Sequence, residues 1–376
     1  MGECVSKTSF PTLNPEPSKL ALFTNTDTEF YRIPALIYIH DSETFLALAE
    51  KRTSLADVDA TRLVLRRGTR EDGRVQWSDM QELTGAGLDG YRTMNPCPVY
   101  EKQTKTVFLF FICVYDKVTE QEQINRRENA ARLCFVKSAD SGQTWSETTD
   151  LTDTVIGDEI KKWATFGVGP GHGIQMTNGR LIIPAYAYYV DFFGPKPQAF
   201  AFYSDDRGDT WKSGQRISAE SGECQMAEII SSDGKSYLYC NARHGGFGDR
   251  FEAWSENGGE SFNKSQCEKK VVETGNGCQA SVVSFKHGDE TWLLFSQPTD
   301  RCNRKNLGVY VNKSPVSGCD WIEPRIINPG YSGYSDLTQC GSDLHFACLL
   351  ERGTSTVEET VFVEFPLSDI KKSYEE

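Results

Sequence analysis

The 376-residue sequence predicts an all-β fold, a six-bladed β-propeller with Asp-box turns, from a repeated turn and the short strands around it. The turn reads Ser-x-Asp-x-Gly-x-x-Trp at 138–145 and 204–211, with a looser copy at 255–262 and a worn copy at 314–321. The copies begin 66, 51 and 59 residues apart, a spacing typical of repeat architectures. Units of this size would fill the chain with about six four-stranded blades around a central axis.

The residues of the repeated turn suit a tight reversal of the chain. Asp140 can accept hydrogen bonds from backbone amides two residues on, and Gly142 permits the positive φ that such a turn needs. Trp145 supplies a large apolar anchor beneath the turn. Any one copy could be an ordinary Asp-Gly turn, but the regular spacing favours a hairpin turn on the rim of a repeated sheet. We expect no catalytic group from it.

Short apolar runs alternate with turns along most of the chain, and each is predicted to be a strand. The first two form a predicted hairpin over His40–Glu43, and a charged, Gln/Ala-containing segment at 120–131 predicts a short helix. We expect an N-terminal arm at 1–28, a propeller at 29–368 and a C-terminal tail at 369–376. The predicted strands are 35–39, 44–50, 62–66, 106–113, 132–137, 180–189, 200–203, 237–240, 251–254, 281–285, 292–295, 345–350 and 361–365.

The charge of the chain excludes one class of partner. It has 40 Lys and Arg against 53 Asp and Glu, a net charge of −13, which argues against nucleic-acid binding and against a generally basic membrane face. Its twelve cysteines show no metal-ligand spacing, and no signal peptide precedes the first strand, so we expect reduced, mostly buried thiols and no metal. The longest apolar run, 107–114, is too short to span a bilayer.

The first six residues contain a possible lipidation motif, which would attach the chain to a membrane. Met1-Gly-Glu-Cys-Val-Ser6 fits the myristoylation pattern with Gly2 as acceptor, and Cys4 could take a palmitoyl chain. An unmodified tail is the alternative, because Glu3 places a charge directly after the glycine. We therefore expect a cytoplasmic protein or a peripheral protein of the plasma membrane.

Three arginines stand at related places in the repeat. Arg32 lies in Tyr-Arg-Ile-Pro at the first strand, Arg243 lies twelve residues before Ser255, and Arg304 lies ten before Ser314. Similar offsets predict equivalent positions in successive blades, pointing toward the common axis. Converging arginines in an acidic protein form a receptor for a carboxylate or phosphate. Three unrelated surface salt bridges are the plain alternative.

Tyr31-Arg-Ile-Pro34 together with the Asp-box repeats resembles the paired signature of the sialidases (neuraminidases), from about Tyr31 to Phe365. Segments 88–97, 118–121, 166–172 and 333–337 are similar to those of the vertebrate cytosolic and plasma-membrane-associated ganglioside sialidases. The resemblance implies a retaining exo-α-sialidase that releases terminal sialic acid from gangliosides, oligosaccharides and glycoproteins, without a cofactor or metal.

The resemblance also implies roles for individual residues. Tyr334 matches the nucleophile, Glu223 its base and Asp57 the acid/base, with Asp59 as a rival for the last role. Taken alone, each would be an ordinary strand tyrosine or surface carboxylate, and His172 in its Gly-rich loop is expected to be structural. The substrate-binding residues that it implies are Arg32, Arg243 and Arg304 on the carboxylate, Glu351 holding the first arginine, and Arg52, Met94, Asn95, Glu120, Tyr186, Tyr188 and Gln279 around the remaining groups.

Two other functions remain open on the sequence. A propeller that binds sialic acid without turnover would need the arginines but not Tyr334, Glu223 and Asp57. A scaffold for protein partners would not bring the arginines together. Tyr186 and Tyr188 alternate along one strand face, so a core aromatic pair is the alternative to a place in the site.

Overall fold

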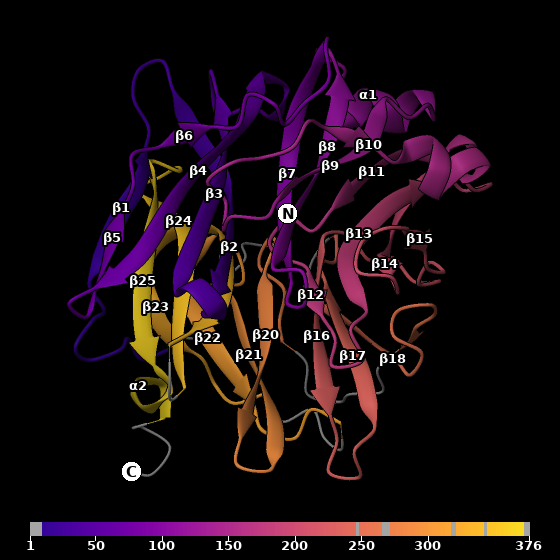
Figure 1. Ribbon diagram of the computed structural model, residues 1–376. Helices are drawn as coiled ribbons and strands as arrows, with labels where there is room; N and C mark the ends of the chain where they lie inside the picture. The colour runs from indigo at the N-terminus through magenta and orange to yellow at the C-terminus, as the bar shows by residue number, and fades with distance from the viewer. Residues whose placement is uncertain (1–9, 246–247, 265–270, 317–320, 342–343, 372–376) are drawn as a thin grey trace.

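The computed structural model describes residues 10–245, 248–264, 271–316, 321–341 and 344–371. It confirms an all-β fold in a β-propeller arrangement, in which the sheets stand around a common axis (Figure 1). Every predicted strand coincides with a strand of the structure, including the hairpin over His40–Glu43. Gly2 and Cys4 lie outside the described residues.

Four separate sheets make up the first two thirds of the propeller. The first sheet contains β2 (Phe30–Ile39), β3 (Thr44–Arg52), β4 (Ala60–Glu71) and β5 (Arg74–Trp77), with β6 (Gln81–Glu82) on β4. The second contains β7 (Tyr91–Glu101), β8 (Thr106–Tyr115), β9 (Ala131–Ser138) and β10 (Thr149–Asp150). The third contains β11 (Trp163–Val168), β13 (Leu181–Tyr189), β14 (Lys196–Ser204) and β15 (Lys212–Ser213), with β12 (Ile174–Gln175) on β13. The fourth contains β16 (Cys224–Ile230), β17 (Ser236–Ala242), β18 (Phe251–Ser255) and β19 (Asn263–Lys264).

The remaining strands form one continuous seven-stranded sheet, so the prediction of six separate blades is not matched. The physical reason is the length of β23, whose first half pairs with β22 and whose second half pairs with β24. Hydrogen bonding therefore passes through β23 without a break between blades. The sheet contains β20 (Ser281–His287), β21 (Glu290–Pro298), β22 (Lys305–Asn312), β23 (Arg325–Cys340), β24 (His345–Gly353), β25 (Glu359–Pro366) and β1 (Lys19–Thr24).

Both ends of the described chain belong to this sheet. β1 pairs antiparallel with β25, and the two lie side by side in Figure 1. Leu13 and Phe23 are buried, because residues that were expected in an arm pack against the C-terminal strands. At the other end a helix, α2 (Leu367–Lys371), crosses the expected boundary at residue 368.

The predicted helix at 120–131 is shorter in the structure. α1 (Glu120–Arg126) begins at a capping box between Thr119 and Glu122 and ends where Arg127 takes a left-handed φ of 57°. Short helical turns not predicted from the sequence are η1 (His40–Ser42), η2 (Asp57–Asp59), η3 (Thr152–Ile156) and η4 (Gly157–Lys162). Within the described ranges, no helix has the length and apolar character to cross a bilayer.

The Asp-box turns are held by the predicted side chains, although Asp140 bonds amides three and four residues on and not two as expected. Asp140 accepts hydrogen bonds from the amides of Gln143 and Thr144 and from the Thr144 hydroxyl, and Ser138 Oγ accepts one from the amide of Gly142 at 2.9 Å. In the copy at 204–211, Ser204 accepts from the amide of Gly208 and Asp206 accepts from the amide and hydroxyl of Thr210, while the amide of Asp209 donates to the Asp206 backbone carbonyl. Burial alone would raise the pKa of Asp140, but its hydrogen bonds with Thr144 and Ser138 lower it to about 2. Part of the worn copy at 314–321 lies outside the described residues.

Cysteine usage departs from the expectation at one position. Cys302, in the segment after β21, is disulfide-bonded, so not every thiol is reduced. Eight other cysteines of the described residues are free and buried: Cys97, Cys113, Cys134, Cys224, Cys240, Cys278, Cys340 and Cys348.

A buried polar network joins the inner strands near the axis. Asp336 on β23 is fully buried and accepts hydrogen bonds from the amide of Leu36 (2.7 Å) and the hydroxyl of Ser281 (2.8 Å). His172 Nδ1 lies 2.7 Å from the same carboxylate, which agrees with the structural role expected for this histidine. Since these partners come from β2, β20 and the loop after β11, one carboxylate ties three parts of the propeller together.

Candidate active site

A cavity of about 690 Å³ opens at one end of the propeller. Its walls come from the starts of inner strands, the ends of the strands that follow them, and the starts of the third strands. Arg32 lies at the start of β2, Arg52 at the end of β3 and Pro197 at the start of β14. The Asp-box turns follow the ends of the third strands, so they lie at the opposite end of the propeller.

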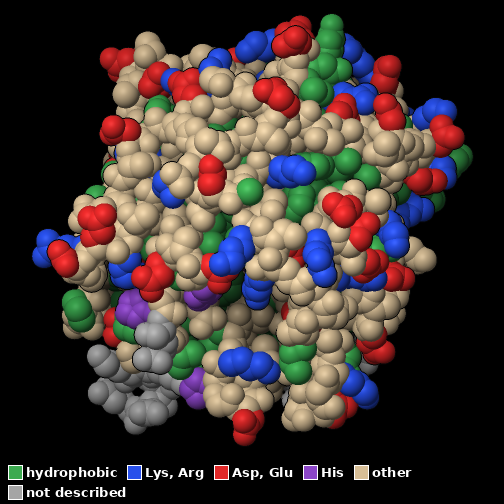
Figure 2. Space-filling view, viewed as in Figure 1, with side chains coloured by type: hydrophobic (Ala, Val, Ile, Leu, Met, Phe, Trp, Pro, Cys, Tyr) green, Lys and Arg blue, Asp and Glu red, His purple; other side chains and the backbone are tan. Residues whose placement is uncertain are grey.

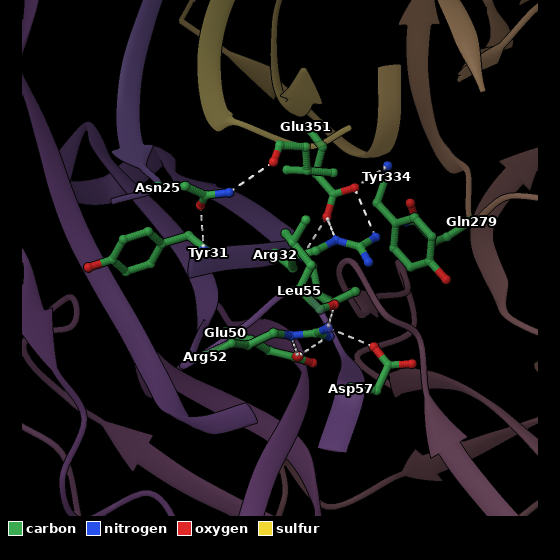
Figure 3. A network of polar contacts seen from close by, with 12 residues as sticks. Asn25, Tyr31, Arg32, Glu50, Arg52, Leu55, Asp57, Gln279, Tyr334 and Glu351 are labelled. Atoms are coloured by element: carbon green, nitrogen blue, oxygen red, sulfur yellow. Dashed lines mark hydrogen bonds and ion pairs between the residues drawn. The ribbon is translucent and has the colours of Figure 1, made fainter. Parts of the chain in front are cut away.

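Arg32 is held by a paired contact with Glu351. Its Nε and Nη2 donate to the two carboxylate oxygens at 2.9 and 3.1 Å, and the amides of Ile33 and Tyr334 donate to the same carboxylate (Figure 3). Glu351 is fully buried, and burial alone would raise its pKa, but the charge of Arg32 and these hydrogen bonds lower it. The arrangement fixes the guanidinium of Arg32 while the side chain still lines the cavity.

Arg243, Glu223 and Tyr334 form one hydrogen-bonded group. Tyr334 Oη donates to Glu223 Oε1 at 2.7 Å, and Arg243 Nη1 donates to Glu223 Oε2 at 2.8 Å and to Tyr334 Oη at 3.2 Å. Burial and the nearby Glu223 raise the pKa of Tyr334 well above its usual value, while Arg243 and Arg304 oppose that rise. The phenol of Tyr334 is therefore neutral, and the Glu223 carboxylate lies within hydrogen-bond distance to accept its proton.

Arg304 completes the arginine group. It donates to the Gly277 carbonyl at 2.9 Å, and its guanidinium lies 5.3 Å from the centre of the Tyr334 ring. Arg32 lies 5.5 Å from the same ring centre. All three arginines line one cavity around one tyrosine, so the alternative of three unrelated surface salt bridges is wrong.

A second network of ion pairs, formed by Glu50, Arg52 and Asp57, holds the Asp57 carboxylate in place. The Arg52 side chain is fully buried, donates from Nε to Glu50 at 2.9 Å, and donates from Nη1 to Asp57 Oδ1 at 2.7 Å (Figure 3). Asp57 lies in η2 with 67% of its side chain exposed, and it lines the cavity. Asp59 is absent from the cavity wall and is bound by Ser54 and Lys117. Of the two rivals, Asp57 is thus the one that faces the site.

Glu120 and the two tyrosines of β13 line another part of the cavity. The Glu120 side chain is exposed to solvent. Desolvation by the protein packed around its carboxyl group, followed by the negative charges of Glu223 and Asp57, nevertheless raises its pKa to about 7. Tyr186 and Tyr188 lie side by side with ring centres 6.4 Å apart. They are cavity residues and not a core pair, although Tyr186 is only 8% exposed.

Met94 and Asn95 reach the cavity because β7 is irregular there. Its pairing with β8 shifts between Met94 and Cys97, and Asn95 has a φ of 58°. β2 has the same feature, with a shift after Arg32 and a φ of 60° at Ile33. Such β-bulges re-aim side chains, so both strands turn consecutive residues toward the site.

Gln279, like Glu351 behind Arg32, is a predicted site residue that does not line the cavity. It is 1% exposed, donates to the Pro170 carbonyl at 3.1 Å and accepts from the amide of Ser335 at 3.1 Å. Through the Ser335 amide it supports the backbone next to Tyr334, beside which it lies in Figure 3. The sequence places Gln279 just before the inner strand β20, but it does not indicate whether the side chain points toward the propeller axis or into the cavity.

Three further residues of the site were not predicted from the sequence. Glu50 is fully buried beneath Arg52, Arg92 lines the cavity and donates to the Asp116 and Val118 carbonyls, and Asn276 accepts from Arg243 through its carbonyl. Glu50 had a signal, because residues two apart on a strand share a face. Arg92 had the same signal, since it lies two residues before Met94 on β7, and Asn276 had none. In the described part of the chain, no group of three or more His, Cys, Asp or Glu has an arrangement that could hold a metal ion.

Residues 44–346 match the family model of the BNR repeat-like domain. The chain is 46% identical to Sialidase-3 of Mus musculus, over 88% of this chain and 89% of that protein. It is 44% identical to Sialidase-2 of Mus musculus, over 94% and 96% of the two chains.

Solved structures share the fold at lower identity. The Hadza microbial sialidase Hz136 superposes with a TM-score of 0.78 at 23% identity, covering 90% of this chain and 66% of that one. The intramolecular trans-sialidase from Ruminococcus gnavus, in complex with oseltamivir carboxylate, gives 0.74 at 17%, covering 94% and 98%. With the family model and the two mouse relatives spanning most of its length, the chain belongs to the sialidase family, the exo-α-sialidases among the glycoside hydrolases.

Proposed function

We propose that the cavity is the active site of a retaining exo-α-sialidase, with Tyr334 as nucleophile, Glu223 as its base and Asp57 as acid/base. The observation that carries the proposal is the 2.7 Å hydrogen bond from the Tyr334 phenol to Glu223, made in a cavity lined by Arg32, Arg243 and Arg304. Arginine clusters suit a carboxylate, and a sialoside carries one on its anomeric carbon.

The substrate charge explains why a tyrosine suits this site. A carboxylate nucleophile would approach the anomeric carbon against the negative charge of the substrate's own carboxylate, whereas a phenol approaches neutral. Tyrosine is the established exception among glycosidase nucleophiles, and it is established for sialidases. A free phenol has a pKa near 10, so it needs a base within hydrogen-bond reach, and Glu223 is placed to take the proton as Tyr334 attacks. Arg243, 3.2 Å from the same oxygen, offsets the charge that develops there.

The other half of the reaction needs an acid that water and substrate can reach. Asp57 lines the cavity with 67% of its side chain exposed, and Arg52 Nη1 donates a hydrogen bond to one of its carboxylate oxygens. It would protonate the leaving oxygen in the first step and activate water in the second, so the sugar is released with its configuration retained. Met94, Asn95, Glu120, Tyr186 and Tyr188 would surround the ring substituents, with Gln279 supporting the nucleophile's strand.

A propeller that binds sialic acid without turnover remains the alternative. It would need the arginines, but it has no use for a phenol hydrogen-bonded to a carboxylate beside them. That pair favours the enzyme.

The proposed substrates are sialylated gangliosides, glycoproteins and oligosaccharides, with a cytoplasmic or peripheral plasma-membrane location. Acylation at Gly2 and Cys4 is part of this proposal. We also propose that the seven-stranded sheet comprises two blades that share β23, which would bring the total to six.

Hydrolysis of a fluorogenic α-sialoside, with the product anomer followed by NMR, tests the proposed function. We expect α-sialic acid as the first product, since two inversions at the anomeric carbon retain its configuration. Initial release of the β anomer would contradict the covalent mechanism, and tight binding without hydrolysis would favour the binding propeller.

A further inference from the structure

The loop between β13 and β14 carries the two most exposed large apolar side chains of the described residues. Phe192 is 93% exposed and Phe193 is 83% exposed, and their rings contact each other edge to face at 5.5 Å. Exposed apolar residues scattered singly are common, but two adjacent phenylalanines at a loop tip gain nothing for folding in water. Such a pair indicates a contact that the isolated chain does not make.

The loop stands at the mouth of the active-site cavity. Tyr188 on β13 pairs with Pro197 on β14, and both line the cavity. One further pair, Tyr189 with Lys196, closes the ladder before the loop begins. Phe192 follows Tyr188 by four residues and Phe193 precedes Pro197 by four, so at a strand rise of about 3.3 Å per residue both lie within roughly 13 Å of the cavity wall along the chain. Whatever the rings contact is thus held beside the mouth through which substrate enters.

We propose that Phe192 and Phe193 insert into the interfacial region of a lipid bilayer and hold the cavity against membrane-anchored sialosides. That the substrate is a sialoside rests on the proposed function. The membrane contact itself rests only on the exposed Phe192 and Phe193 of the loop. Each aromatic side chain can bury roughly 150–250 Å². Two rings fall well short of the about 800 Å² per partner that a stable protein interface needs. They suffice for a shallow anchor, which penetrates only the boundary between headgroups and acyl chains.

The residues beside the rings fit the same surface. Lys196 is exposed with Nζ 6.0 Å from the centre of the Phe193 ring, so a cation lies at headgroup level next to the inserted side chain. Attraction to anionic lipids cannot carry the contact, because the net charge of the chain is −13 and basic and acidic side chains are interspersed over the face drawn in Figure 2. Apolar insertion must carry it, and binding should therefore persist in neutral lipid and at high salt.

The test uses the full chain with Gly2→Ala and Cys4→Ser, so that acylation cannot contribute. Co-sedimentation with phosphatidylcholine vesicles is measured at 0.1 and 0.5 M salt, alone and with a sialoglycolipid in the bilayer. We expect Phe192→Ser with Phe193→Ser to lower vesicle partitioning at least about tenfold at both salt concentrations. Hydrolysis of the glycolipid in vesicles should fall in proportion, while kcat/KM for soluble sialyllactose stays unchanged. Val316→Ser is the matched control, an apolar residue 42% exposed beyond the end of β22 at the opposite end of the propeller.

Three outcomes would overturn the inference: no binding of the unsubstituted loop to phosphatidylcholine, an equal loss of activity on the soluble and the vesicle substrates, or a concentration-dependent dimer that disappears with the Phe substitutions. The last would make a second copy the occupant. Failure of the proposed function looks different, because sialyllactose would then not be hydrolysed at all, and vesicle binding would still report on the loop.

Discussion

Tyr334 and Glu223 share a hydrogen bond of 2.7 Å, and replacing the phenol by phenyl removes one oxygen while leaving the ring near Arg32 and Arg304. We expect Tyr334→Phe to lower kcat at least about a thousandfold, because the nucleophile is lost, while sialic acid binds within a fewfold of its original affinity. Steady-state kinetics and calorimetric titration with sialic acid measure the two quantities. Tyr331→Phe, on the same strand and half-buried, should leave kcat unchanged. Normal turnover by Tyr334→Phe would remove it from the nucleophile role.

Glu120 is the cavity carboxylate whose pKa is raised to about 7, from an ordinary value of 4.5. As the pH rises through 7, its ionisation adds a negative charge near Glu223, Asp57 and the substrate carboxylate. We expect kcat/KM to fall by about fivefold across that step, and Glu120→Gln to remove this limb of the pH profile. Glu128→Gln, exposed just beyond α1, should retain it. A limb near pH 7 that persists in Glu120→Gln would assign it to another group.

The same shift gives a stability prediction with a definite sign. The folded protein keeps the proton on Glu120 up to about pH 7, whereas the unfolded chain releases it near 4.5. Protonation therefore favours the folded state, and this contribution is lost as the pH rises from about 4.5 to 7. Glu120→Gln should flatten the stability profile in that window.

Sequence reasoning brought Arg32, Arg243 and Arg304 to one site correctly, because each had a fixed position in a motif or repeat. It failed where the direction of a side chain depends on the packing of blades. Gln279 and Tyr334 were expected together in the cavity, yet Gln279 turns to the backbone of Pro170 and Ser335. Arg92 shows the reverse, since its place in the cavity depends on the path of the chain at Asp116 and Val118.

At the scale of single elements, the Asp-box turn also packs against the neighbouring blade. A Cβ at Gly208 would lie 2.3 Å from Phe108 on β8, and Gly208 has a φ of 91°. Gly179 has nearly the same φ, 93°, with nothing within 4 Å of its Cβ position. The two glycines thus separate backbone strain from steric overlap.

We expect Gly179→Ala to cost about 1 kcal/mol of stability from the positive φ, and Gly208→Ala to cost a further 1–3 kcal/mol, roughly, from overpacking against Phe108. Urea denaturation of the two variants beside the parent protein measures the difference. Equal losses at the two sites would show that the box turn does not depend on its contact with β8.

The thirteen predicted strands and the box turns have local signals: alternation, apolar runs, and Ser, Asp and Gly at fixed offsets, whereas strands such as β7, β16 and β23 were missed. The joining of β20–β22 with β24, β25 and β1 into one sheet through β23 was not predictable from the sequence. Asn328-Pro329-Gly330 reads as a break between strands, and Gly330 does take a φ of 84°, yet pairing with β22 and then β24 continues on either side of it. Pairing partners are set by tertiary contacts, which local sequence does not contain.

At the scale of the whole molecule, the sheets meet around an axis where polar groups are fully buried. Asp336 accepts from Leu36 on β2 and Ser281 on β20, and contacts His172 after β11. Ser296 and Ser335 bond to each other at 2.9 Å in the same region, and Gln225 donates to the Pro170 carbonyl. A buried network of this kind stabilises only while every member has a partner.

Asp336→Asn tests whether this network unites the propeller. The amide has one acceptor oxygen in place of two, so either the Leu36 amide or the group formed by His172 and Ser281 loses its acceptor and faces a donor instead. We expect a loss of about 3 kcal/mol in folding stability, since breaking a buried charged network costs about 3–5 kcal/mol and the amide keeps part of it. Thermal unfolding at a fixed scan rate should keep a single transition at a lower temperature, because three parts of the propeller weaken together. Asp233→Asn, an exposed carboxylate in the β16–β17 turn, should leave the unfolding temperature unchanged. A second transition in Asp336→Asn would mean that the sheets unfold independently and that the axis does not couple them.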